Sequence, residues 1–88
     1  MVFVTAIHMA GGTGHEHIAD LRWLNCSDSK SNTMTTARVV NWLNEGNKLW
    51  VADKDTPAEV RVVNASPPYL RTVANGQYSD NLLSLPRF

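Results

Sequence analysis

Residues 33–46 read TMTTARVVNWLNEG, and this stretch decides the fold because it carries the strongest helical pattern of the chain. At about 100° per residue its apolar side chains cover one wide arc. The remaining polar stripe consists of Arg38, Asn41 and Glu45. Thr33 suits the amino-terminal cap and Gly46 the carboxyl-terminal cap, which predicts a helix over Met34–Glu45. Trp42 falls at the margin of the arc, where it either covers the core or meets another molecule.

Two strands are expected before this helix. Val2–Met9 is a β-branched, apolar run, and the glycines that follow it tolerate a tight turn. His15–Leu24 alternates, with one face formed by His17, Ala19, Leu21 and Trp23. These two segments predict a hairpin. Asn25–Asn32 is polar, short-chained and aperiodic, which predicts a loop.

A second hairpin is expected after the helix. Lys48–Ala52 and Glu59–Val63 are strand-like segments, joined by the polar connection Asp53–Pro57. Tyr69–Val73 follows a pair of prolines and predicts a fifth strand at a sheet edge, before a turn at Asn75-Gly76. The remaining residues form an irregular tail.

These elements predict a single α+β domain over residues 1–88. Its architecture is an antiparallel sheet of four to five strands with a single helix on one face, in the order ββαββ plus an irregular C-terminal tail. One helix leaves the second sheet face uncovered. Because Phe3 and Ile7 are expected on that face, the pattern predicts self-association.

Charge and cysteine content narrow the function classes. Eight basic and eight acidic residues give a formal net charge of zero, which argues against nucleic acid as a partner. Cys26 is the single cysteine, so no disulfide forms within the chain and a reducing, cytoplasmic location is expected. Because no segment is long and apolar enough to cross a bilayer, we expect no membrane partner.

The segment Gly11–Ile18 reads GGTGHEHI and suggests two kinds of site. In a strand, His15 and His17 project to one side and supply two metal ligands. His8 and Cys26 are further candidates, but none has a recognised metal-binding spacing, so we expect no metal and no cofactor. A phosphate loop needs a helix after its glycines, whereas a strand is expected here. GGTG is therefore interpreted as a hairpin turn.

The histidines after this turn are interpreted as architectural. His17 shares a strand face with Trp23, where a neutral imidazole fills volume and makes one hydrogen bond. Glu16 would point away from both His15 and His17, which argues against an acid–base pair. A cross-strand ion pair, for example with Arg71, is the expected role of Glu16. No catalytic residue is predicted, and an enzyme is not the favoured interpretation.

Three groups of residues resemble one known family. They are GGTGHEHI near the start, Glu45-Gly46-Asn47 with Trp50-Val51 in the middle, and PPYLRT at 67–72 with DNLLSLP at 80–86. Nearly the whole chain is similar to short bacterial and phage proteins grouped as domain-of-unknown-function family 3892. The resemblance implies no established activity. It implies a shared pattern that contains Gly14, His15, Glu16, His17, Tyr69, Arg71, Asp80 and Asn81.

The candidate binding residues are His15, Glu16, His17, Tyr69, Arg71, Asp80 and Asn81. Arg71, Asp80 and Asn81 with His15 have two interpretations: they tie down the irregular tail, or with Tyr69 they rim a protein-binding patch. We expect a non-enzymatic interaction module that binds a protein partner, itself included, as an inhibitory or accessory factor. The first alternative is a small-ligand or metal-binding domain, or an enzyme, that uses the GHEHI corner. The second is a single-stranded nucleic-acid binder with an aromatic and arginine platform.

Overall fold

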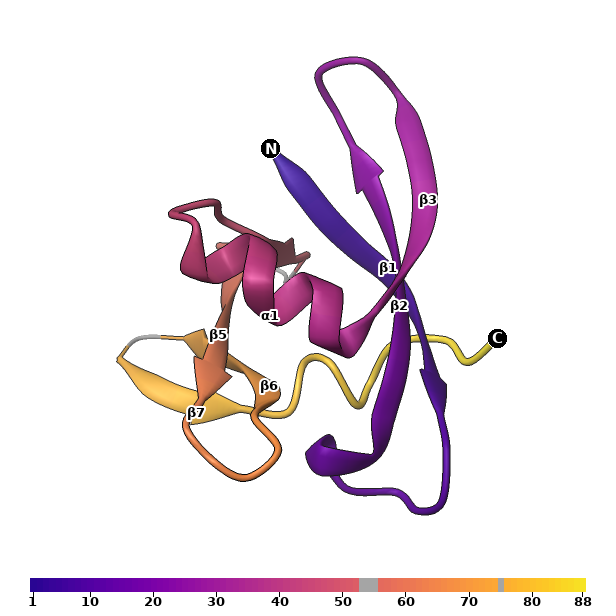
Figure 1. Cartoon of the computed structure of the whole chain (residues 1–88). Helices are drawn as coiled ribbons and strands as arrows, with labels where there is room; N and C mark the ends of the chain where they lie inside the picture. The colour runs from indigo at the N-terminus through magenta and orange to yellow at the C-terminus, as the bar shows by residue number, and fades with distance from the viewer. Residues whose placement is uncertain (53–55, 75) are drawn as a thin grey trace.

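The computed structural model of the protein describes residues 1–52, 56–74 and 76–88. Within these residues the chain forms one α-helix, one 3₁₀ turn and a seven-stranded sheet (Figure 1). The elements are β1 (Val2–Met9), η1 (His15–His17), β2 (Ile18–Asn25), β3 (Lys30–Thr35), α1 (Thr36–Asn44), β4 (Trp50–Val51), β5 (Ala58–Val63), β6 (Tyr69–Ala74) and β7 (Gln77–Ser79). The predicted α+β class with a single helix is therefore confirmed.

The sheet itself differs from the prediction of four to five antiparallel strands. It has seven strands in the order β3-β2-β1-β4-β5-β6-β7, and it is mixed because β1 and β4 run parallel, with Phe3 opposite Trp50. Since β3 and β1 both run antiparallel to β2, β3 runs in the same direction as β4. The connection between them through α1 is thus a crossover that passes over β2 and β1. This crossover places the helix on the sheet.

β3 replaces part of the loop predicted at Asn25–Asn32. It pairs with β2 in continuous register, from Asn25 opposite Lys30 to Asp20 opposite Thr35. All of its side chains are exposed except Met34, which is half-buried opposite Leu21. A strand exposed on both faces needs no apolar alternation, so its sequence resembles a loop.

The helix begins later than predicted. Thr35, rather than Thr33, is the amino-terminal cap, and its hydroxyl accepts a hydrogen bond from the Arg38 backbone N–H at 3.3 Å. Met34 belongs to β3, so the first helical turn starts only after that strand ends. The predicted end is confirmed, since Gly46 follows the last turn with φ +99°.

The hairpin of β1 and β2 is confirmed, but its second strand starts at Ile18, because the preceding His15–His17 forms the η1 turn. Gly11 takes a φ of +79°, as the predicted turn requires. Gly12 has no room for a Cβ atom, because the His17 imidazole lies against it. The glycines therefore turn the chain and let η1 fold back onto the loop.

The second predicted hairpin is also confirmed, as β4 pairs with β5. Part of its predicted connection, residues 53–55, lies outside the described residues. β6 was expected at an edge but lies between β5 and β7, because the chain turns back once more as Gln77–Ser79. In the expected Asn75-Gly76 turn, Asn75 lies outside the described residues and Gly76 has φ +78°.

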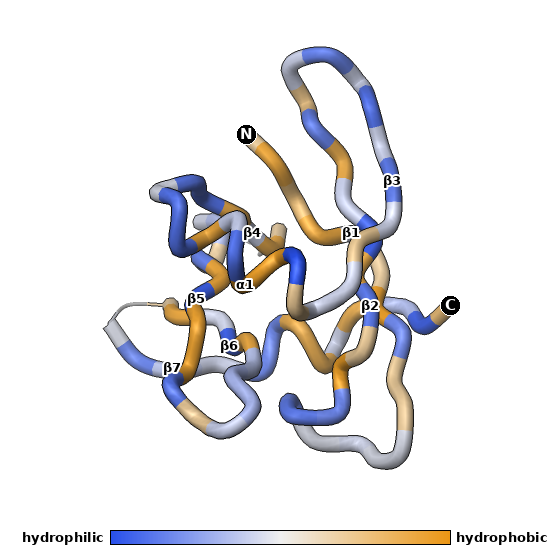
Figure 2. The backbone as a smooth tube through the Cα atoms, in the orientation of Figure 1, coloured by the Kyte–Doolittle hydropathy of each residue, from blue (hydrophilic) through white to orange (hydrophobic). Residues whose placement is uncertain are grey.

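The core lies between α1 and the sheet and includes the C-terminal tail. Its buried apolar residues are Val4, Ile7, Ile18, Leu21, Val39, Val40, Leu49, Val51, Val60, Leu70 and Leu82. Leu82 of the tail is fully buried. The tail then crosses to β1, where the Ile7 N–H donates to the Pro86 carbonyl at 2.9 Å and the Phe88 N–H donates to the Ile7 carbonyl at 3.1 Å (Figure 1). Figure 2 shows hydrophilic residues gathered along β3 and the β2–β3 turn and hydrophobic residues along β1.

Candidate functional site

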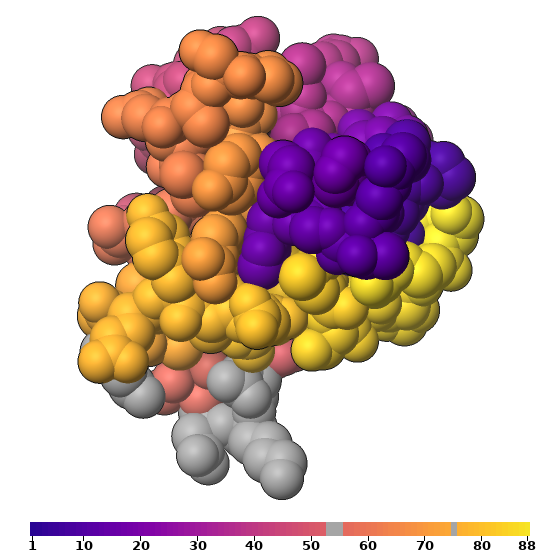
Figure 3. All heavy atoms as spheres, turned by 90° about the horizontal axis from the view of Figure 1, so that it is seen from below, coloured from indigo at the N-terminus to yellow at the C-terminus, as the bar shows by residue number. Residues whose placement is uncertain are grey.

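The fold brings the GHEHI corner and the PPYLRT strand together. η1 contacts β6, and Figure 3 shows the two segments side by side from below. Asp80, at the start of the tail, joins them: its Oδ1 lies 3.6 Å from His15 Nε2 and accepts a hydrogen bond from Arg71 Nη2 at 3.3 Å. Three residues far apart in the sequence thus form one polar cluster, as the sequence analysis grouped them.

His15 is the buried member of this cluster, with 9% of its surface exposed. Burial lowers the pKa of His15 below 6.5, and the positive charge of Arg71 lowers it further, against the opposing effects of Asp80 and Glu16. The imidazole is therefore neutral at pH 7. Its Nε2 is buried without a hydrogen bond, as is Arg71 Nε.

Asn81 has a structural role in the same region. The Ser79 hydroxyl donates to Asn81 Oδ1, and the fully buried Thr72 hydroxyl donates to the Ser79 carbonyl at 3.0 Å. These bonds fix the turn from β7 into the tail. They satisfy backbone and side-chain groups where the regular strand pairing ends.

The expected roles of the two histidines in η1 are reversed in the structure. His17, expected on an apolar strand face, has 38% of its side chain exposed, whereas His15 is buried. The cause is η1: a 3₁₀ turn does not alternate its side chains between two faces as a strand does.

Glu16 was expected to point away from His15 and His17, and this prediction is wrong for the same reason. Glu16 Oε1 lies 3.7 Å from His17 Nε2. The expected ion pair of Glu16 with Arg71 is absent from the described contacts, because Arg71 pairs with Asp80.

Glu16 and Tyr69 line a groove of about 340 Å³ between η1, α1 and the Pro67-Pro68 segment. His8 lies elsewhere, on β1, where its Nδ1 contacts the carbonyl of Phe88. In residues 1–52, 56–74 and 76–88, no group of three or more histidine, cysteine, aspartate or glutamate side chains is placed to hold a metal ion.

A second feature is the sheet surface that we call the outer face. Directly paired residues of antiparallel strands point to the same side. The register therefore aligns Trp50 with Glu59, Val73 and Tyr78, and sets Arg61 beside Arg71 and Val63 beside Tyr69. Alternate residues such as Val60 and Leu70 are buried toward the core. The outer face thus consists of Trp50, Glu59, Arg61, Val63, Arg71, Val73 and Tyr78, with Tyr69 at its border, where it also lines the groove beside α1.

The most exposed aromatic ring of the outer face is Tyr78, at 57% exposure. The Arg71 guanidinium carbon lies 4.8 Å from the centre of this ring, which is a cation–π distance. Asp80 forms an ion pair with the same guanidinium. Arg71 and Tyr78 are therefore held as a pair before any partner arrives.

Charges of both signs border this pair. Glu59 accepts hydrogen bonds from Arg61 Nε at 3.1 Å and Nη2 at 2.9 Å, and Lys48 Nζ lies 3.6 Å from its other oxygen. The hydrogen bond from Arg61 is the main cause that lowers the pKa of Glu59. The carboxylate therefore stays charged near neutral pH and fixes Arg61 on the face.

The apolar second face expected from Phe3 and Ile7 is not formed. Ile7 is fully buried as part of the core cluster, and Phe3 is half-buried. Among the described residues, the large apolar side chains that are exposed are Met1, Tyr78 and Phe88. The uncovered part of the sheet is therefore the outer face of β4–β7 rather than the face of β1.

Comparison with known protein families shows to which family the chain belongs. The model of the family described as "Protein of unknown function (DUF3892)" matches residues 3–86. The chain belongs to the DUF3892 family. No curated protein and no solved structure matches it. The membership confirms the resemblance found in the sequence, and the family description gives no activity.

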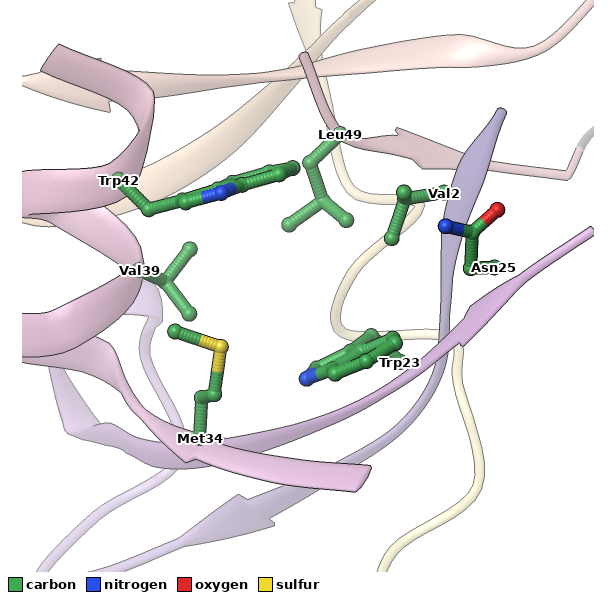
Figure 4. Close-up of a pocket in the computed structure, with 7 residues that line it drawn as sticks. All are labelled: Val2, Trp23, Asn25, Met34, Val39, Trp42 and Leu49. Carbon is green, nitrogen blue, oxygen red and sulfur yellow. The ribbon is translucent and has the colours of Figure 1, made fainter. Parts of the chain in front are cut away.

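In this DUF3892 member, sequence reasoning also missed a pocket beneath α1. It is lined by Val2, Trp23, Asn25, Met34, Val39, Trp42 and Leu49 (Figure 4). The available signal was Trp42 at the margin of the helical arc, which the structure packs against the core. The described part of the chain contains no helix of the length and hydropathy that crossing a membrane requires.

Proposed function

We propose that the chain is a small non-enzymatic interaction module that associates with a second copy of itself through the outer face. The observation that carries this proposal is the Arg71–Tyr78 pair, in which Tyr78 is exposed and the half-buried Arg71 is held by Asp80. Tyrosine and arginine are enriched among the residues that dominate binding energy at protein interfaces. A pair that is already ordered loses less conformational entropy on binding.

The charges of the outer face favour a second copy over a partner of strong opposite charge. Arg61 and Arg71 lie on the same face as Glu59, with Asp80 at its border, so two copies related by a two-fold axis offer each other both signs. The formal net charge of the chain is zero. Two copies therefore do not repel each other at long range.

Binding is better supported than catalysis by the GHEHI corner. The His15 Nε2 is buried and the imidazole contacts a carboxylate that is itself held by Arg71. This arrangement supports a role in positioning Asp80 and Arg71 beneath Tyr78. A cytoplasmic location, which the single Cys26 supports, and an accessory or inhibitory role belong to the same proposal.

Sedimentation velocity tests the proposal, with the protein concentration varied over about two orders of magnitude. We expect the average mass to rise from one chain toward two, and Tyr78→Ser to shift this equilibrium toward the monomer by about tenfold or more, as for an interface anchor.

The matched control is Phe88→Ser. Phe88 also lies beneath a guanidinium, with Arg22 Cζ 4.5 Å from its ring centre, and is 39% exposed, but it is outside the outer face. A protein that stays monomeric throughout, or an equal effect of both substitutions, would show that the outer face is not a self-association surface.

A further inference from the structure

The pocket beneath α1 carries an inference that is independent of self-association. It has a volume of about 140 Å³ and lies between the helix and the β1–β2–β3 part of the sheet. Figure 4 shows the indole rings of Trp23 and Trp42 on opposite sides of the space, with Val39 and Met34 at one end and Leu49 and Val2 at the other. For comparison, an apolar cavity of about 150 Å³ is large enough for benzene.

The lining selects an uncharged, apolar ligand. No lining residue carries a charge, and burying an unpaired charge in such surroundings is costly. The Trp42 indole and the Met34 thioether favour an aromatic ring, which stacks on the indole and contacts the sulfur. The size of the space limits this ligand to a single ring.

Two hydrogen-bond donors at the pocket specify one more property of the ligand. Trp23 Nε1 is buried and has no hydrogen bond. A buried indole N–H is normally paired, so this group lacks the acceptor that its burial calls for. The side-chain oxygen of Asn25 already accepts a hydrogen bond from the Ser27 N–H, at 3.0 Å, which leaves its amide nitrogen as a second donor.

We propose that this pocket binds a small, uncharged, single-ring aromatic molecule whose carbonyl-type oxygen accepts a hydrogen bond from Trp23 Nε1. The ring packs on the indole face of Trp42 and beside Met34, and its oxygen meets the edge of the Trp23 indole that carries Nε1. This assigns a ligand-binding function to a site that is separate from the outer face.

Nuclear magnetic resonance of the indole N–H groups tests this proposal with two probes of nearly equal shape. Acetophenone carries the carbonyl oxygen, and α-methylstyrene has a methylene group in its place. We expect acetophenone to shift the Trp23 N–H signal saturably and to leave the signal of Trp50, which is outside the pocket, unchanged. α-Methylstyrene should bind about two- to tenfold more weakly, since it lacks one hydrogen bond. Benzoate, which is charged, should not bind.

Two variants locate the site and the donor. Val2→Phe fills the pocket from a half-buried position and should abolish binding of both probes. Trp23→Phe keeps a ring but removes the donor, so acetophenone should bind it no better than α-methylstyrene does. Equal binding of the two probes to the unaltered protein, no saturable shift with acetophenone, or full binding by Val2→Phe would each overturn the proposal. The two-probe comparison in the unaltered protein remains decisive if a variant fails to fold.

Discussion

Replacement of Leu82 by alanine tests whether the irregular tail is part of the core. Leu82 is fully buried and belongs to the main apolar cluster, although it lies in no strand or helix. Removing a buried leucine side chain loses its transfer free energy and leaves a cavity, which together cost about 2–5 kcal/mol. For a domain of 88 residues, a loss of about 3 kcal/mol corresponds to a decrease in Tm of about 12–24 °C.

The assay is urea unfolding followed by tryptophan fluorescence, with all variants at one protein concentration because association would add to the apparent stability. Leu83→Ala is the matched control, since Leu83 is the next residue and only half-buried. We expect it to lower the free energy of unfolding by about 1 kcal/mol. If Leu82→Ala is no more destabilising than Leu83→Ala, the tail does not pack as described and the reasoning about the core is wrong.

Two further predictions concern the GHEHI corner. Gly12→Ala should lower the free energy of unfolding by about 1–3 kcal/mol, because the added methyl group meets the His17 ring, and in a double-mutant cycle His17→Ala should remove most of that cost. The lowered pKa of His15 means that the unfolded chain takes up a proton more readily than the folded protein. Its contribution to stability should therefore be intact above pH 6.5 and decrease as the pH falls below that value toward the folded-state pKa. Urea unfolding at a series of pH values should show this decrease, and His15→Gln should flatten it; an unchanged pH profile in the variant would contradict the assignment.

The sequence predicted the elements that have a strong local pattern. The alternation of Glu59–Val63, the apolar run of Val2–Met9 and the glycine after the helix each correspond to a described feature. β3 was missed because an outer strand with both faces in solvent has no apolar period. η1 was missed because the alternation of β2 happens to continue back through His15–His17.

The strand order could not be predicted from local sequence patterns. Nothing in the residues of β4 indicates that it pairs in parallel with β1 rather than only with its hairpin partner, because the crossover through α1 is a property of the whole chain. The contact between Arg71 and Asp80 is one that residue types indicate, since a guanidinium partly removed from water pairs with a carboxylate. The pocket was missed because its lining comes from β1, β2, β3, α1 and the segment before β4, which no single pattern joins.

The central position of β1 in the sheet affects how the chain folds during synthesis. This strand pairs with β2, with β4 and, at Ile7, with residues 86–88. Its second edge pairs with β4 at Phe3 but stays open at Ile7 until residues 86–88 have been made, so this part of the native sheet forms only after translation of that segment. A nascent chain stalled before residue 86 should therefore expose the edge of β1 and be the form most prone to aggregation.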